Sequence, residues 1–116
     1  MSNISFDWDG TVTKAPAEFL AFAKALRAAG HKVYIVTMRY PSELGDLEYW
    51  RRHVDGIIPT SRGAKRPAAK AQGVYIDIWI DDNPGAVDKS ATELWGNATP
   101  EGTVDPHPVS ESECVQ

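Results

Sequence analysis

Short apolar runs alternate with segments of helical spacing along most of the chain. The runs are rich in β-prone residues and predict strands at 2–7, 32–37, 56–59 and 75–81. The segments between and after them predict helices at about 16–30, 42–52, 64–72 and 86–94. Because strand and helix alternate, we expect an α/β fold with a mainly parallel sheet and right-handed crossovers.

Details of the pattern refine this expectation. The run 32–37, KVYIVT, is almost continuously apolar, which is typical of a strand buried on both faces. In the second predicted helix, Leu44, Leu47 and Trp50 recur at every third position. A sheet of four to five strands is expected, and the one candidate for a fifth strand is 92–95.

The composition changes at about Asn97. The last twenty residues contain three prolines and almost no bulky apolar side chain, so they cannot bury much surface. We therefore expect one folded domain at 1–96 and a loosely packed or disordered tail at 97–116.

Composition places the chain in a broad class. A length of 116 residues fits one domain, and 42% hydrophobic with 24% charged residues is ordinary for a globular protein. The formal charge of -4 argues against broad attraction to nucleic acids or anionic membranes. Cys114 is the single cysteine, and the chain has neither a membrane-spanning run nor a secretory signal, so we expect a cytoplasmic protein.

Candidate chemistry begins where the first predicted strand ends. Asp7 and Asp9 flank the end of that strand, and Gly10 and Thr11 follow at once. In an open α/β sheet, ligands bind outside the carboxyl ends of the strands. Two close carboxylates repel each other, and a divalent cation such as Mg²⁺ relieves this conflict. The alternative is an acidic surface turn, since D-G is a common turn dipeptide.

Further polar residues fall at the ends of later predicted elements. Thr37 ends the second strand, Lys65 opens the third helix, and Asp81 with Asp82 ends the fourth strand. Each residue alone fits a structural or solvent-exposed role. Their common placement indicates a shared site.

In these four segments the chain resembles the phosphatases of the haloacid dehalogenase (HAD) superfamily. FDWDGT is similar to the first motif of the family, and YIVT, ending at Thr37, to the second. Lys65 in RGAKRPAAK matches the third motif, and WIDDNP, with Asp81 and Asp82, the fourth. The resemblance spans residues 3–88 and implies a Rossmann-like three-layer sandwich.

The resemblance also implies a role for each residue. Asp7 would be the nucleophile that forms an aspartyl-phosphate, and Asp9 the general acid and base, with its backbone carbonyl on Mg²⁺. Thr37 would hold a phosphoryl oxygen, and Lys65 would offset negative charge. The metal ligands would be Asp7, Asp9, Asp82 and Asp81, with Asp82 the direct ligand and Asp81 orienting Lys65 or a metal-bound water.

Two positions and the spacing of the motifs bear on this assignment. Lys70 competes with Lys65 for the third motif, and we prefer Lys65 because it begins the predicted helix near the active edge of the sheet. The short intervals from Thr11 to Thr37 and from Thr37 to Lys65 leave no room for a cap domain. The chain therefore resembles the capless members, whose open clefts admit large substrates or are closed by a partner subunit.

Several side chains are candidates for substrate contact. Trp8 either lines the cleft or packs against a neighbouring element, and Arg39 either grips a phosphate or lies in an exposed loop. A basic cluster could follow a nucleic-acid backbone, although a solvated helix face is the preferred interpretation. The candidate substrate contacts are Trp8, Gly10, Thr11, Met38 and Arg39, and the basic cluster is Arg62, Lys65, Arg66 and Lys70.

The sequence thus predicts a Mg²⁺-dependent phosphatase that hydrolyses a phosphate monoester. The substrate would be a nucleotide, a nucleic-acid end or a small metabolite, with no membrane partner, and a homo-oligomer is one option. One alternative is a binding or regulatory module that keeps the fold and the metal but turns over poorly. Another is a receiver-type phosphoacceptor domain, which ranks lower because such domains lack the DxDGT turn.

Overall fold

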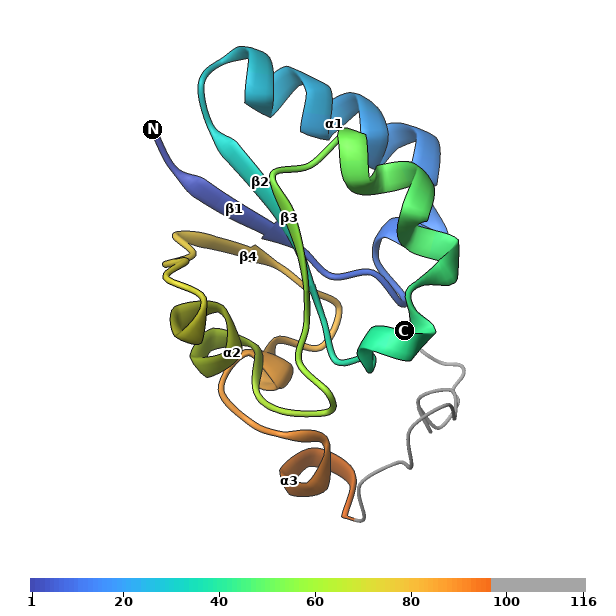
Figure 1. The fold of residues 1–116 in the computed structure, drawn as a ribbon, viewed down its shortest axis with the longest axis vertical. Helices are drawn as coiled ribbons and strands as arrows, with labels where there is room; N and C mark the ends of the chain where they lie inside the picture. The colour runs from blue at the N-terminus through green and yellow to red at the C-terminus, as the bar shows by residue number, and fades with distance from the viewer. Residues whose placement is uncertain (97–116) are drawn as a thin grey trace.

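A computed structural model of the chain describes residues 1–96, so the tail predicted at 97–116 lies outside the described residues. The fold is a compact α/β fold around one sheet, in which every strand pairing is parallel (Figure 1). The strand order is β3-β2-β1-β4. The strands are β1 (Asn3–Phe6), β2 (Lys32–Thr37), β3 (Gly56–Pro59) and β4 (Ile78–Ile80). The predicted α/β class and parallel sheet are confirmed.

The connections are helices of two kinds. The α-helices are α1 (Pro16–Ala28), α2 (Lys65–Ala71) and α3 (Ala91–Trp95). The 3₁₀ segments are η1 (Val12–Lys14), η2 (Pro41–Glu43), η3 (Gly45–Arg52) and η4 (Pro84–Val87). Within residues 1–96, no helix is long and apolar enough to cross a membrane.

Each face of the sheet packs against its own apolar cluster. On one face, Phe6, Val33 and Ile35 join side chains from α1 and η3, and on the other, Val36 joins Ile58 and Ala69 of α2. Successive side chains of a strand point to opposite faces, so β2 contributes to both clusters. The predicted burial of this strand on both faces is therefore confirmed.

The segment predicted as a helix at 42–52 is instead two 3₁₀ segments that meet between Glu43 and Gly45. Leu47 and Trp50 are buried as expected. A 3₁₀-helix has three residues per turn, so side chains three apart lie on the same side. The strict three-residue spacing of Leu44, Leu47 and Trp50 fits this geometry better than that of an α-helix.

The fourth strand is shorter than predicted because side chains replace part of its ladder. The backbone N–H of Asn3 donates to the Asp77 carboxylate at 2.8 Å, and the Asn3 amide donates to the carbonyl of Tyr75 at 2.8 Å. The backbone N–H of Asp77 also donates to the carbonyl of Asn3. The regular strand therefore begins only at Ile78.

The fifth strand considered at 92–95 is wrong, because this segment is helix α3. Ser90 accepts a hydrogen bond from the backbone N–H of Glu93, and the Glu93 carboxylate accepts one from the backbone N–H of Ser90. This reciprocal pair is a capping box, which starts a helix. The predicted helix at 86–94 is divided into η4 and α3.

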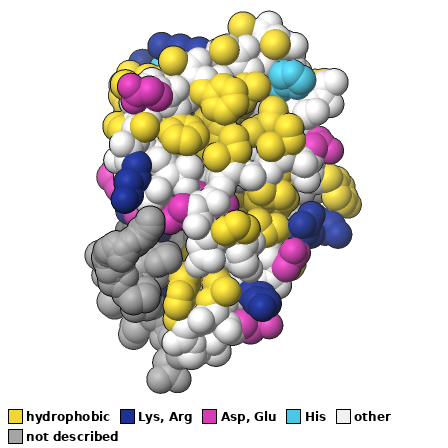
Figure 2. All heavy atoms as spheres, turned by 180° about the vertical axis from the view of Figure 1, so that it is seen from behind, with side chains coloured by type: hydrophobic (Ala, Val, Ile, Leu, Met, Phe, Trp, Pro, Cys, Tyr) yellow, Lys and Arg dark blue, Asp and Glu magenta, His cyan; other side chains and the backbone are white. Residues whose placement is uncertain are grey.

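Some large apolar side chains remain at the surface. Figure 2 shows apolar side chains gathered mainly in the upper half of the face seen from behind. Phe22 and Ile78 are 42% and 49% exposed, and Ile78 lies in β4, the last strand in the sheet order. A homo-oligomer stays a prediction.

Candidate functional site

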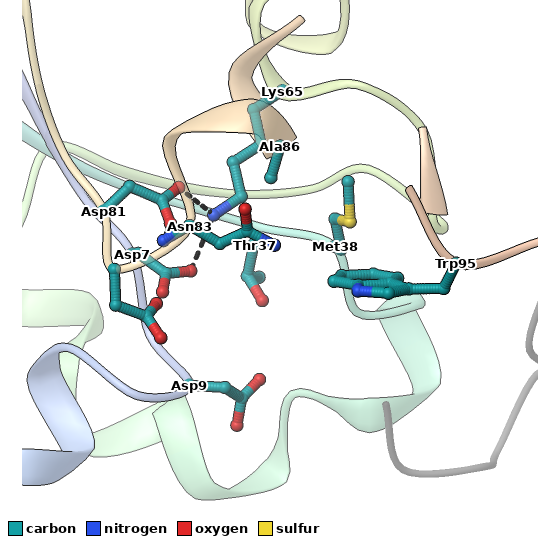
Figure 3. A pocket seen from close by; sticks show the side chains of 10 residues that line it. Asp7, Asp9, Thr37, Met38, Lys65, Asp81, Asn83, Ala86 and Trp95 are labelled. Carbon is teal, nitrogen blue, oxygen red and sulfur yellow. Dashed lines mark hydrogen bonds and ion pairs between the residues drawn. The ribbon is translucent and has the colours of Figure 1, made fainter. Parts of the chain in front are cut away.

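A small pocket opens at the carboxyl edge of the sheet (Figure 3). Asp7 follows β1, Thr37 ends β2, Lys65 begins α2, and Asp81 and Asp82 follow β4. Parallel strands bring their carboxyl ends to one edge, so four segments far apart in the sequence meet there. The lining residues are Asp7, Asp9, Thr37, Met38, Lys65, Asp81, Asp82, Asn83, Ala86 and Trp95.

Lys65 connects the first and fourth strands electrostatically. Its Nζ lies 2.6 Å from Asp7 Oδ1 and 2.6 Å from Asp81 Oδ2, and Lys65 is only 2% exposed. Burial lowers the pKa of Lys65, but Asp7 and Asp81 outweigh this effect and leave the pKa raised, so the amine stays charged. The contact with Asp81 agrees with the expectation that Asp81 orients Lys65. Lys70, the competing candidate, is exposed on the same helix.

Three carboxylates converge beside this lysine. Asp7, Asp81 and Asp82 each offer an oxygen, and these atoms lie within 4.8 Å of one another. Three carboxylates against one ammonium leave an excess of negative charge, and burial raises the pKa of Asp7 well above its usual value. Hard oxygen donors with unbalanced negative charge suit a divalent cation, so this acidic group could hold a metal ion.

The turn after β1 packs directly against Asp82. Gly10 has φ +86°, and a β-carbon at this position would lie 2.5 Å from Asp82 Oδ2. The hydroxyl of Thr11 lies 3.2 Å from Asp7 Oδ2 and accepts a hydrogen bond from the backbone N–H of Asp82 at 3.2 Å. Gly10 and Thr11, predicted as substrate contacts, thus hold the two carboxylates in place and do not line this pocket.

Asp9 lines the pocket, but its carboxylate stands apart from the other three (Figure 3). Arg39 donates to both of its oxygens, with Nε 3.0 Å from Oδ2 and Nη2 2.7 Å from Oδ1. Arg39 is itself held by the carbonyl of Glu43 and the carboxylate of Asp46. The hydrogen bonds that Arg39 donates to Asp9 raise the pKa of the guanidinium further. Within the described residues, the Asp9 side chain is therefore not part of the acidic group; the role of its backbone carbonyl stays a prediction.

The structure also bears on two open alternatives. Trp8 is buried against Trp50, with ring centroids 5.7 Å apart, and its Nε1 donates to Asp46, so it packs in the core and does not line the cleft. Arg39 is not an exposed loop residue, because it pairs with Asp9 and Asp46; its contact with a phosphate stays a prediction. Met38 does line the pocket, as expected.

Three lining residues were not predicted. The backbone N–H of Asn83 donates to Asp81 Oδ1 at 2.9 Å, which fixes the Asp81 side chain. Ala86 and Trp95 form an apolar side of the pocket. The capping box at Ser90 was visible in the sequence as S-x-x-E, and it could have placed Trp95 on a helix instead of a strand.

The basic cluster at the start of α2 does not form a continuous basic surface. Arg62 is buried and pairs with Glu43, and Lys65 is buried in the acidic group. Arg66 is partly exposed and pairs with Asp88. The structure therefore removes the basis for expecting this cluster to follow a nucleic-acid backbone. Comparisons of the chain with models of protein families, with curated proteins and with solved structures found no match.

Proposed function

We propose that this protein is a small, capless phosphatase of the HAD type that hydrolyses a phosphate monoester with Mg²⁺. The observation that carries the proposal is the meeting of Asp7, Thr37, Lys65 and Asp82 around one pocket, although they come from four separate segments. The two covered faces of the sheet and the strand order β3-β2-β1-β4 also support a Rossmann-like three-layer sandwich.

Asp7 is the proposed nucleophile. A carboxylate oxygen of Asp7 attacks phosphorus, the bond from phosphorus to the leaving oxygen breaks, and an aspartyl-phosphate forms. Lys65, 2.6 Å from Asp7 Oδ1, offsets charge at the nucleophile and the phosphoryl group, and the Thr37 hydroxyl holds a phosphoryl oxygen. Bound Mg²⁺ supplies neutralising charge, and Asp7 and Asp82, with Asp81 beside them, are the residues that would hold it.

Asp9 is the proposed general acid and base. It donates a proton to the leaving oxygen and then takes one from the water that attacks the aspartyl-phosphate, which releases inorganic phosphate and restores Asp7. To protonate the leaving oxygen, the Asp9 carboxyl must reach it, whereas both of its oxygens accept hydrogen bonds from Arg39. Turnover therefore requires Asp9 to leave Arg39.

This pairing is the observation that favours the second candidate, a binding or regulatory module that turns over poorly. If Arg39 keeps Asp9 paired throughout, the site binds a phosphorylated ligand without efficient release of the leaving group. The leaving group itself distinguishes the two functions. Asp9→Asn should slow hydrolysis of an alkyl phosphate much more than that of p-nitrophenyl phosphate, whose leaving group needs little protonation.

The main test is phosphate release from p-nitrophenyl phosphate, with and without Mg²⁺. Wild type should require Mg²⁺, and Asp7→Asn should lose essentially all activity. Asp88→Asn is the matched control, because it makes the same chemical change at an exposed carboxylate outside the pocket. Equal rates for wild type and Asp7→Asn would exclude the proposed nucleophile.

A further inference from the structure

One side of the pocket is apolar, in contrast to the acidic side that faces it. Met38, Ala86 and Trp95 line this side, and Figure 3 shows the Trp95 ring beside Met38, across the pocket from the aspartates. Met38 and Ala86 are 5% and 3% exposed and belong to a small cluster of their own, separate from the two that cover the sheet. We call Met38, Ala86 and Trp95 the apolar wall.

Hydrogen bonds and close packing fix the apolar wall relative to the acidic side. The backbone N–H of Arg62 donates to the carbonyl of Met38 at 2.8 Å. The carbonyl of Arg62 accepts from the backbone N–H of Ala91, at the start of α3, also at 2.8 Å. A β-carbon at Gly85 would lie 3.1 Å from the Leu94 side chain, so η4 and α3 pack closely. Trp95 is thus carried on a helix that is tied to the strand-end loop after β2.

Charge around the pocket restricts what the apolar wall can face. Four of the lining side chains are carboxylates. Among the lining residues that the structure describes, Lys65 alone is positively charged, and it already contacts Asp7 and Asp81. A leaving group with a second phosphate would meet repulsion here, whereas a flat neutral ring would meet an indole face and a thioether.

We infer that the apolar wall binds a flat aromatic ring on the leaving group, so that the preferred substrates are nucleoside monophosphates and similar aromatic monoesters. This inference rests on the proposed phosphatase function and assigns its substrate class. Trp95 is the specificity-determining residue, because stacking on its ring distinguishes a substrate with a base from one without it.

The test compares adenosine 5′-monophosphate with ribose 5-phosphate, which present the same leaving oxygen and differ in the base. We expect a higher kcat/KM for adenosine 5′-monophosphate in wild type. Trp95→Ala should lower the ratio of the two kcat/KM values by about tenfold or more, the usual effect of losing one stacking contact. Trp95→Phe, which keeps a flat ring, should retain most of the preference.

The outcomes separate this inference from the proposed function. A wild-type ratio near one, or a ratio that Trp95→Ala leaves unchanged, would overturn the inference while leaving the phosphatase intact. If no substrate releases phosphate, the proposed function fails, and calorimetric binding of the same two compounds to wild type and the Trp95 variants still decides the inference. If Trp95→Ala does not fold, Trp95→Leu replaces it, since leucine keeps apolar bulk without a ring.

Discussion

The contact of Lys65 with two carboxylates makes a sharp prediction about stability. Lys65 is 2% exposed, and its Nζ lies 2.6 Å from both Asp7 Oδ1 and Asp81 Oδ2. Lys65→Met keeps most of the apolar stem and removes the charge. The variant leaves a buried carboxylate, and a second one beside it, without their cation.

The expected cost follows from the burial of the pair. Breaking a buried ion pair by removing one partner costs about 3–5 kcal/mol, because the remaining charge stays desolvated. A domain of this size has a free energy of unfolding of about 5–15 kcal/mol, so the loss is a large share of the total. Lys70→Met, on the exposed part of the same helix, should change stability by less than about 0.5 kcal/mol.

Urea denaturation of wild type and both variants, followed by circular dichroism at neutral pH, measures these differences. In thermal unfolding followed by the same signal, the melting temperature of Lys65→Met should fall by more than about 12 °C. Added Mg²⁺ should reduce the difference in stability between wild type and Lys65→Met, because a cation bound to the folded state stabilises it and supplies positive charge to the same carboxylates. If Lys65→Met is as stable as Lys70→Met, the buried pair does not exist as described; if only the Mg²⁺ effect is missing, the proposed metal site is at fault.

Two further predictions concern the turn after β1 and the loop after β2. Gly10→Ala and Gly73→Ala both place a β-carbon at positive φ, which costs about 1–2 kcal/mol of stability each. Only the β-carbon at position 10 would collide with Asp82, so only Gly10→Ala should weaken Mg²⁺ affinity, by about 10–100-fold in a titration. Equal Mg²⁺ affinities of the two variants would contradict the described packing. Burial raises the pKa of Glu43, but the hydrogen bond from the Tyr40 backbone and the ion pair with Arg62 outweigh burial and lower the pKa. The ionised Glu43 therefore stabilises the fold above the unfolded value of 4.5, and this stabilisation is lost as pH falls. Glu43→Gln should therefore lose less stability than wild type on acidification below about pH 5, and parallel curves would show that the pair does not stabilise the fold.

The sheet could be predicted because burial on a pleated strand leaves a clear pattern. The run 32–37 is almost continuously apolar, which is typical of a strand buried on both faces, and its predicted bounds match β2. The prediction of one strand-end edge also placed Thr37 and Asp82 together, and both line the same pocket. Topology, not local propensity, made this step, since parallel strands share their carboxyl edge.

Pairings between distant side chains could not be predicted from the pattern of apolar and polar residues. The sequence placed Arg39 two residues past Thr37, but its bonds to Asp9 and Asp46 depend on where the turn after β1 and η3 lie in space. Likewise, the burial of Trp8 depends on Trp50, which lies more than forty residues away. The local sequence around a residue does not indicate such distant partners.

The proposed chemistry requires that the hydrogen bonds from Arg39 to Asp9 break during turnover. The carboxyl proposed as the general acid accepts two hydrogen bonds from a guanidinium that two further acceptors fix in place. A phosphate monoester is itself an anion, so its arrival at the pocket would offer Arg39 a competing partner. Release of Asp9 from Arg39 would then depend on substrate binding, so that the proposed general acid is free to move only when a leaving group is present.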